Sequence, residues 1–515
     1  MRQHISKLIC AILLVCLMLP ATFGEAAAKD SIVVVVGAEP QSLDVHNTRA
    51  NSDEMVAWHI YESLVTRNNP ELEIKPGLAE SWTVSEDGLV WTFKLREGVK
   101  FHDGTLFNAQ AVKYNFDRLL DPENPTIKSG VFNFIQQVEV VDDYTVRFIN
   151  KFPFGAVLAH LAHPGGGIAS PAALEKYGSR LSDNPVGTGP YRLKTWVPGD
   201  RIVLERYDKY QGSAKPTLRE IVFKVAREEA TRVMMLETGE ADLATNIPPD
   251  EAERLKSNPN LQVLRCPTNR VIYIGINNLS APFDNVKVRQ AVNYAVDNEA
   301  ILEHVLNGYG DICDSPVAPL TWGYVEGKRY EYNPEKAKQL LEEAGVVPGT
   351  RIRLWTPQGR YLKDAETAQA VAGYLSAVGF NVDFQIMEWG AYSAKTTVVP
   401  DKAEHQLFLM GGSPSTADAD WLLRAVLTTD SLPPVGYNSY YYSNEVVDEL
   451  VIKAQQTVDP EERLAIYGEI QEIIREDAPW IFLTIMENVA VARKDLGGVI
   501  ISPLEYVFAY DAYLN

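Results

Sequence analysis

The sequence has 515 residues, with 48 Lys and Arg residues against 68 Asp and Glu residues, and its formal net charge is −20. An acidic excess of this size repels phosphate backbones and anionic lipid heads, which argues against nucleic-acid binding. A chain of this length is too long for one hydrophobic core, so we expect two or more lobes of ordinary size.

Residues 1–28 are predicted to be a signal peptide. A short basic segment precedes an unbroken apolar run, Leu8 to Leu19, which is too short to span a bilayer comfortably. The small residues Ala26-x-Ala28 form a cleavage site just before the polar residue Lys29. The mature protein is therefore expected to begin near Lys29 and to be exported, with the periplasm as its location.

A lipid anchor on the outer face of the membrane is the alternative, because the leader contains Cys10 and Cys16. A lipid-attachment site needs a small residue immediately before the cysteine, and here Ile9 and Val15 stand there. Beyond the leader, no apolar stretch approaches the length of a transmembrane helix. We therefore expect a soluble mature protein.

Short β-rich segments dominate the first half of the chain. Alternating apolar residues and flanking turn residues predict the strands Ile32 to Val36 and Val90 to Leu95, and the hairpins Val138 to Ile149 and Tyr191 to Arg206. A helix is predicted over Asn108 to Leu120, because its apolar residues share one face and Asn108 is a suitable N-cap.

Helices and strands alternate in the second half. Asn333 and Asp459 are predicted to cap helices that begin with Pro334 and Pro460, and Gly345 is expected to end the first of them. The predicted strands are Ile352 to Trp355, Val382 to Ile386 and Leu407 to Met410. This alternation predicts an α/β lobe with a mixed or parallel sheet. No flexible linker joins the lobes, and a cleft between such lobes is a common ligand site.

No enzyme signature is present in the chain: it lacks G-x-S-x-G, the P-loop, H-E-x-x-H and the dinucleotide fingerprint. The segment Gly411 to Ser415 comes nearest to a nucleophile elbow and is better explained as a loop that lines a pocket. His160 and His163 have no acidic or cysteine partner nearby in sequence, so local hydrogen bonding is favoured over metal binding. We expect no catalytic residue, metal or cofactor.

Two cysteines lie outside the leader, Cys266 and Cys313. In an oxidising compartment they can form one disulfide, which would stabilise the fold by about 4 kcal/mol in the chain-entropy treatment. The alternative is a pair of buried thiols that behave as small apolar residues. The sequence leaves both alternatives open.

Aromatic residues gather in the second half near the glycine-serine loop, and Tyr and Trp combine apolar contact area with a hydrogen-bonding edge. Such residues suit a pocket for a peptide-like molecule, whereas ordinary core packing is the alternative. They are Trp389, Tyr392, Tyr437, Tyr440, Tyr441 and Tyr442.

Residues 79 to 112, AESWTVSEDGLVWTFKLREGVKFHDGTLFNAQAV, resemble the signature region of the extracytoplasmic peptide-binding proteins of ABC importers, the dipeptide/oligopeptide/nickel family. Further segments are similar in the same order along the chain. They are NPVGTGPY at 184 to 191, LNGYG at 306 to 310, YNPEKAKQLLEEAG at 332 to 345, GRYLKDAETAQAVAGYLSAVGF at 359 to 380 and MEWGAYSAK at 387 to 395. The resemblance covers essentially the whole mature chain.

The resemblance implies an α/β, two-lobed periplasmic-binding-protein fold of the large peptide-binding, type II-like class, with mixed sheets. The first lobe is expected to hold residues 29–272 and 488–515, with an inserted subdomain at about 75–185, and the second lobe 273–487. The chain would cross between lobes near Val271 to Asn277 and Glu487 to Val491. The partners implied are a short peptide or peptide-like solute and the membrane permease, with the protein working as a monomer.

The family's ligand site maps onto segments of the second lobe. Arg360 stands where dipeptide binders clamp the ligand carboxylate, and Arg270 is a second candidate cation. Dipeptide binders place an aspartate in the loop that here reads GGSPSTADADW, and Ser415 stands in its place. This loop is similar to that of the glutathione-binding branch. The expected ligand-binding residues are Arg270, Arg360, Trp389, Ser413, Ser415, Thr416, Asn438 and Tyr440.

Other functions remain open from the sequence. The same fold could bind a metal chelate or an oligosaccharide, and an exported peptide-processing enzyme is a more remote alternative. Asp418 and Asp420, in the same loop, suit the start of a helix as well as a pocket.

Overall fold

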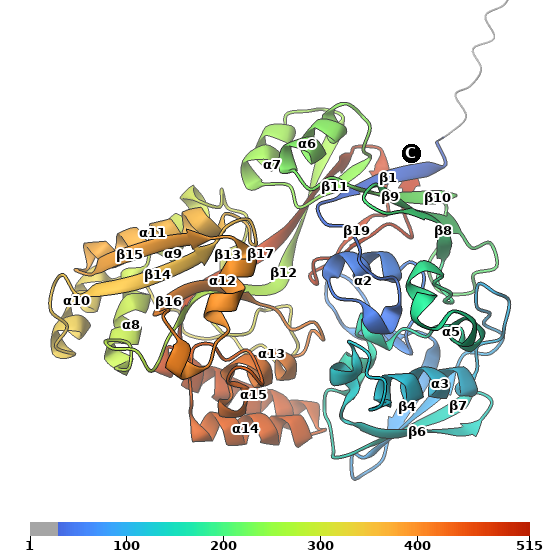
Figure 1. The fold of residues 1–515 in the computed structure, drawn as a ribbon, viewed down its shortest axis with the longest axis horizontal. Coiled ribbons are helices and arrows are strands. Elements are labelled where there is room, and N and C mark those ends of the chain that lie inside the picture. The colour runs from blue at the N-terminus through green and yellow to red at the C-terminus, as the bar shows by residue number, and fades with distance from the viewer. Residues whose placement is uncertain (1–28) are drawn as a thin grey trace, which may run out of the picture.

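The computed structural model describes residues 29–515, so the predicted signal peptide lies outside the described residues. Figure 1 shows two bodies side by side, one built from the first half of the chain with the C-terminal tail and one built from the residues between. Two long antiparallel strands, β12 (Leu261–Ile276) and β17 (Trp480–Arg493), run from one body into the other. We call these bodies the first lobe and the second lobe.

A single 11-stranded sheet runs through both lobes in the order β15-β14-β16-β12-β17-β11-β1-β10-β9-β8, and β13 pairs with β17. The sheet is mixed, because β1 is parallel to β10 and β14 is parallel to β15, whereas β12 is antiparallel to β16. Its other strands are β1 (Ser31–Val36), β8 (Tyr191–Val197), β9 (Arg201–Arg206), β10 (Glu220–Val225), β11 (Leu243–Thr245), β13 (Asp311–Ile312), β14 (Arg351–Pro357), β15 (Asn381–Met387) and β16 (Leu407–Gly412).

The crossover between the lobes lies within β12 and β17. Their pairing is regular from Leu261 to Pro267, shifts register between Pro267 and Val271 and again between Ile272 and Tyr273, and ends at Gly275. The irregularity frees the backbone at 268–270 for contacts with other segments, as β-bulges commonly do. Pro267, which has no backbone N–H to donate to the ladder, stands where the register first shifts.

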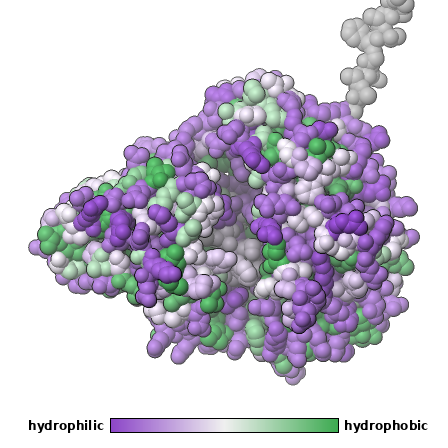
Figure 2. Space-filling model, viewed as in Figure 1, coloured by the Kyte–Doolittle hydropathy of each residue, from purple (hydrophilic) through white to green (hydrophobic). Residues whose placement is uncertain are grey.

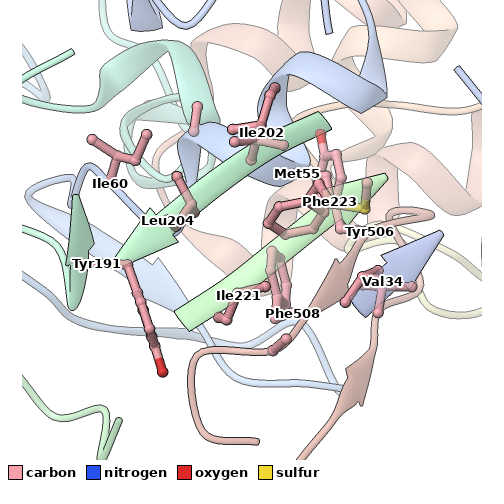
Figure 3. Close-up of a cluster of buried hydrophobic side chains, with 14 of the residues drawn as sticks. Val34, Met55, Ile60, Tyr191, Ile202, Leu204, Ile221, Phe223, Tyr506 and Phe508 are labelled. Carbon is pink, nitrogen blue, oxygen red and sulfur yellow. The ribbon is translucent and has the colours of Figure 1, made fainter. Parts of the chain in front are cut away.

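The C-terminal tail completes the core of the first lobe. Buried side chains of β9 and β10, among them Ile202 and Phe223, pack with Met55 and with Tyr506 and Phe508 of the tail (Figure 3). Tyr506 is 2% exposed, and its hydroxyl donates to Glu54 Oε2 over 2.5 Å. These contacts join the C-terminal tail to segments near the start of the chain.

A four-stranded antiparallel sheet forms a subdomain of the first lobe, with the order β4-β5-β7-β6. Helix α3 (Ala109–Leu120) packs on it, and the rings of Phe116 and Phe148 lie edge to face at 4.7 Å between centroids. Asn108 caps α3 by accepting a hydrogen bond from the Ala111 amide over 3.0 Å, as predicted. The strands are β4 (Ala79–Val84), β5 (Val90–Leu95), β6 (Ile135–Asp142) and β7 (Thr145–Asn150).

Helices cover both faces of the sheet in the second lobe. Alternate residues of β12 enter two separate clusters, Tyr273 on one face with Trp480, and Ile274 on the other with Leu354. This is the period-two burial expected of a strand covered on both sides. The main helices are α8 (Val286–Ala295), α10 (Pro334–Glu343), α11 (Asp364–Ala377), α13 (Ala419–Leu427), α14 (Glu445–Gln456) and α15 (Pro460–Asp477).

Shorter elements connect these units. They are α2 (Asn51–Ala57), β2 (Val65–Arg67), β3 (Ile74–Pro76), α4 (Val157–Leu161), α5 (Pro171–Tyr177), α6 (Glu229–Glu237), α7 (Pro249–Leu255), α9 (Asn298–His304), α12 (Trp389–Thr396), β18 (Leu496–Gly497), β19 (Ile500–Ile501), β20 (Val507–Phe508) and β21 (Tyr513–Leu514). Short 3₁₀ helices lie at Val45–Asn47, Ser129–Phe132, Pro164–Gly166, Gly178–Asp183, Pro400–Lys402 and Thr429–Ser431. Within residues 29–515, no helix is both long enough and apolar enough to cross a bilayer.

Cys266 and Cys313 are free thiols, so the disulfide alternative is wrong for this structure. Cys313 is buried and donates to the Ser315 carbonyl over 2.9 Å. Burial raises the pKa of Cys266 to about 11 and that of Cys313 to about 12. Both groups therefore stay protonated at neutral pH and pack as small apolar side chains.

Candidate functional site: the face between the lobes

Three parallel strands of the second lobe end at one edge of the sheet. β14 pairs in parallel with both β15 and β16, so their carboxyl ends lie together. The chain leaves these ends at Arg360, Trp389 and Ser413, which brings three predicted site residues to one place. Ligands commonly bind in the crevice outside the carboxyl ends of such strands. The molecular surface is hollowed between the two lobes (Figure 2).

Arg360 is held by its backbone while its side chain stays exposed. The amides of Gly359, Arg360 and Tyr361 donate to the carboxylate of Asp364 over 3.1, 2.8 and 3.0 Å. The guanidinium carbon lies 5.0 Å from the ring centroid of Tyr361 and 5.2 Å from that of Trp389. Arg360 forms no ion pair with any described residue, so this cation is positioned by aromatic rings and available to an anion.

Arg270, in contrast, already has an acidic partner. Its Nε donates to Glu505 Oε1 over 2.5 Å, and its Nη1 donates to the Gly411 carbonyl over 3.3 Å. Burial lowers the pKa of Arg270 and the Glu505 carboxylate raises it, with a net upward shift. The pair joins the crossover strand to the C-terminal tail of the first lobe, at the bottom of the face between the lobes.

The loop after β16 is fastened to the crossover strand. Ser413 Oγ donates to Asn269 Oδ1 over 2.7 Å, and Asn269 Nδ2 donates back to the Pro414 carbonyl over 2.8 Å. Ser415 is half-buried, and its hydroxyl makes no hydrogen bond within residues 29–515. Thr416 is fully buried, and its carbonyl accepts a hydrogen bond from Arg67 of the first lobe. The loop therefore contacts both lobes, and the Ser415 hydroxyl has no hydrogen-bond partner among the described residues.

Further contacts hold the lobes together, so the structure is a closed form. Arg67, which reaches the Thr416 carbonyl of the second lobe, is itself fixed within the first lobe by the carbonyls of Ala159 and Ala162, at 2.9 and 3.1 Å. The Gly155 amide of the subdomain donates to the Gln455 carbonyl at the end of α14 over 3.0 Å. On the opposite side of the crossover, Lys363 Nζ pairs with Asp250 at 2.6 Å.

Residues 73–432 match the bacterial extracellular solute-binding proteins, family 5 Middle. The chain belongs to this family. Among its relatives, the glutathione-binding protein GsiB of Shigella dysenteriae is 37% identical over 505 residues, which cover 97% of each chain.

Solved structures of similar proteins share the two-lobed fold of this family 5 protein. The periplasmic binding protein DppA of Helicobacter pylori, in complex with the peptide STSA, is 29% identical with a TM-score of 0.79, covering 95% of this chain and 98% of the other. The dipeptide-binding protein of a Pseudoalteromonas species, in complex with Met-Leu, is 25% identical with a TM-score of 0.79, covering 94% and 100%. The fold predicted from the sequence is confirmed.

Two residues predicted to contact the ligand belong to the core of this solute-binding protein. Asn438 is fully buried, and its amide donates to the carbonyls of Thr428 and Tyr442 over 2.9 and 2.8 Å. Tyr440 is 2% exposed, stacks on Phe408 at 5.3 Å between centroids and shares its hydroxyl hydrogen bond with Tyr273. Both predictions are wrong for this structure, because tertiary packing already satisfies these groups.

Sequence reasoning missed Arg67, Glu505 and Tyr361 at the face between the lobes. Tyr361 could have been found, because it directly follows Arg360 in a segment that resembles the family. No sequence signal separates Arg67 or Glu505 from ordinary surface charges, since contacts with residues hundreds of positions away define their roles.

Asp418 acts at the start of a helix rather than in a pocket. It caps α13 by accepting from the Asp420 amide over 3.0 Å, and it pairs with Arg463 at 2.6 Å. His163 accepts from the Gly165 amide over 2.9 Å, in agreement with the local hydrogen bonding favoured from the sequence. Within residues 29–515, no group of three or more His, Cys, Asp and Glu side chains could hold a metal ion.

Proposed function

We propose that this family 5 protein is the exported, monomeric solute receptor of an ABC importer and captures glutathione, or a similar small anionic peptide, between its lobes. The observation that supports this proposal most strongly is the environment of Arg360. Its exposed guanidinium lies near the rings of Tyr361 and Trp389 and has no acidic partner among the described residues. The names of the 37% identical relatives support the choice of glutathione. The captured solute passes to the membrane permease without chemical change.

The charges at the face between the lobes suit a ligand with more than one carboxylate. Arg360 can bind a ligand carboxylate with two parallel hydrogen bonds. Arg67 is a second cation, and the structure gives it carbonyl partners rather than an ion pair within residues 29–515. Glu505, which already lies beside Arg270, can receive a ligand ammonium.

Ser415 separates this site from that of ordinary dipeptide binders. Residues 413–416 carry no acidic side chain, and the carboxylate of Asp418 is held by Arg463. A ligand group close to this loop therefore meets hydroxyls rather than a carboxylate. Such a loop accepts an anionic or neutral ligand group without repulsion, which favours glutathione, with its second carboxylate, over an unmodified dipeptide with only one.

A thermal-shift screen of the refolded, ligand-free mature protein tests the proposal. The panel contains glutathione, dipeptides, tripeptides, longer peptides and nickel-histidine. Ligand at a hundredfold excess over its dissociation constant stabilises a protein by about 2.7 kcal/mol, so a clear rise in melting temperature is expected with glutathione. A shift with unmodified dipeptides alone, or with nickel-histidine alone, would assign another cargo.

Closure can be tested at Gly155, where the subdomain contacts the end of α14. A Cβ atom at this position would lie 2.2 Å from the Thr457 carbonyl oxygen and 2.8 Å from Arg463 Cδ. Gly155→Ala is therefore expected to weaken glutathione binding roughly five- to thirtyfold, or about 1–2 kcal/mol, because overpacking disfavours the closed form.

The matched control is Gly130→Ala in the same subdomain, where a Cβ atom meets nothing within 4 Å. Binding is measured by isothermal titration calorimetry. Equal affinity of the two alanine variants would show that ligand capture does not require this closed contact.

A further inference from the structure

His160 and Asp420 face each other across the contact between the lobes. His160 lies on α4 of the subdomain, and Asp420 lies on α13 of the second lobe. His160 Nε2 and Asp420 Oδ2 are 4.0 Å apart, and the two side chains are 2% and 0% exposed. With the lobes in contact, both groups are therefore shielded from water.

Hydrogen bonding determines where protons can sit on this pair. His160 Nδ1 lies 2.6 Å from the Val131 carbonyl, which can only accept, so Nδ1 carries a hydrogen. A neutral imidazole then has a bare lone pair on Nε2. Within residues 29–515, neither this nitrogen nor either carboxylate oxygen of Asp420 has a hydrogen-bond partner. An ionised Asp420 would face the lone pair with no hydrogen between them.

The charged groups around the pair do not place a hydrogen between the Nε2 lone pair and the Asp420 carboxylate. On the second lobe, Arg424 Nε lies 3.6 Å from Asp420 Oδ2 but is 37% exposed, and Arg463 is held by Asp418. On the first lobe, the neighbouring titratable groups are His163, Lys128 and Arg67, none of which is acidic. Arg67 is bound to carbonyls. The rings of Phe134, Phe154 and Trp421 enclose His160 at 5.3, 5.0 and 6.0 Å between centroids.

We propose that closure of the lobes takes up one proton, which Asp420 and His160 share across the contact, so that capture of the ligand is favoured at lower pH. This inference rests on the proposed function, because it links closure to binding. A carboxyl hydrogen on Asp420 would lie between Oδ2 and Nε2 in place of two facing lone pairs, and a small shortening of the 4.0 Å separation would complete the hydrogen bond. The pair thus acts as a proton-dependent latch.

The pKa directions agree with this geometry. Burial raises the pKa of Asp420 and Asp418 adds to this shift, whereas Arg424 and Arg463 oppose it. Burial lowers the pKa of His160 from 6.5 to about 4. Both directions favour a shared proton on Asp420 over a proton on His160 Nε2 in the closed form.

The sign of the pH dependence follows from the protons bound in each state. The latch takes the two groups to have their ordinary pKa values of 3.8 and 6.5 once the lobes part and water reaches them, so that above pH 7 the open pair binds little proton. A closed pair that keeps its proton over this range then makes closure up to about tenfold weaker for each unit that the pH rises. Below about pH 6 the dependence vanishes, because His160 is already protonated in the open form.

Calorimetric titration with glutathione at pH 6, 7 and 8 tests the latch. The dissociation constant of the wild-type protein is expected to rise about five- to tenfold from pH 7 to pH 8. Asp420→Asn should remove this rise, because the amide donates to Nε2 without a titrating proton. Asp250→Asn is the control, since Asp250 lies in another contact between the lobes and its pKa is lowered, mainly by the hydrogen bond from Lys363. It should keep the wild-type pH slope, and the same slope in Asp420→Asn would overturn the latch.

A second measurement separates failure of the latch from failure of the proposed ligand. If glutathione binds at no pH, the ligand proposal fails, and the latch is then judged on the ligand-free protein by small-angle X-ray scattering. The radius of gyration should be smaller at pH 6 than at pH 8 in the wild type, and this difference should be absent in Asp420→Asn. Equal radii of the wild type at both pH values would overturn the latch.

Discussion

Replacing Arg360 with alanine is expected to weaken glutathione binding about thirtyfold, which corresponds to about 2 kcal/mol, the usual contribution of a hydrogen-bonded charge contact. The backbone of residues 359–361 is held by Asp364 whatever side chain follows, so the variant should fold normally. Isothermal titration calorimetry at fixed salt and pH measures the change.

Two variants sharpen this test. Arg360→Lys keeps the positive charge but loses the planar guanidinium that can donate two parallel hydrogen bonds, so an intermediate affinity for glutathione is expected. Arg351→Ala removes a cation from the same strand-to-helix unit, but Arg351 is 73% exposed and pairs with Asp383 on the surface, so binding should not change. Wild-type affinity in Arg360→Ala would show that the ligand carboxylate lies elsewhere.

Asp418→Ala is expected to destabilise the second lobe by about 3–5 kcal/mol, because it leaves a charged guanidinium buried without its partner. Arg463 Nη2 and Nη1 lie 2.6 and 3.0 Å from the two oxygens of Asp418, and the two side chains are 4% and 3% exposed. Urea unfolding followed by tryptophan fluorescence reports the loss. An unfolding midpoint equal to that of the wild type would contradict it.

The double variant Asp418→Ala/Arg463→Met serves as the matched control for the buried pair. It removes both charges, so much of the stability lost in the single variant should return. Glu343→Ala breaks the ion pair with Lys287, whose side chains are 49% and 41% exposed, and no measurable change is expected there.

Local structure could be predicted from the sequence because its signals are local. Asn108, Asn333 and Asp459 each accept a hydrogen bond from the amide three residues later, as their positions before apolar periodic segments predicted. The order of the strands and the resemblance at residues 79–112 together led to the two-lobed fold. The strand at Val90–Leu95 has the predicted bounds, because alternation of apolar residues specified both ends.

The site could be predicted only in part, because burial and long-range pairing are tertiary properties. Arg360 and Trp389 lie beside each other since both follow parallel strands, which the β/α alternation implied. Tyr440 and Asn438 looked like pocket residues from their types alone, but packing against β12 and the helices buries them. The pairing of His160 with Asp420 depends on the contact between the lobes, for which no local pattern exists.

Isothermal titration of glutathione into the refolded, ligand-free mature protein tests the central claim most directly. The proposed function predicts saturable binding of one glutathione per chain, with a clear preference over unmodified dipeptides. Absence of binding across pH 6 to 8, or tighter binding of a dipeptide than of glutathione, would contradict it.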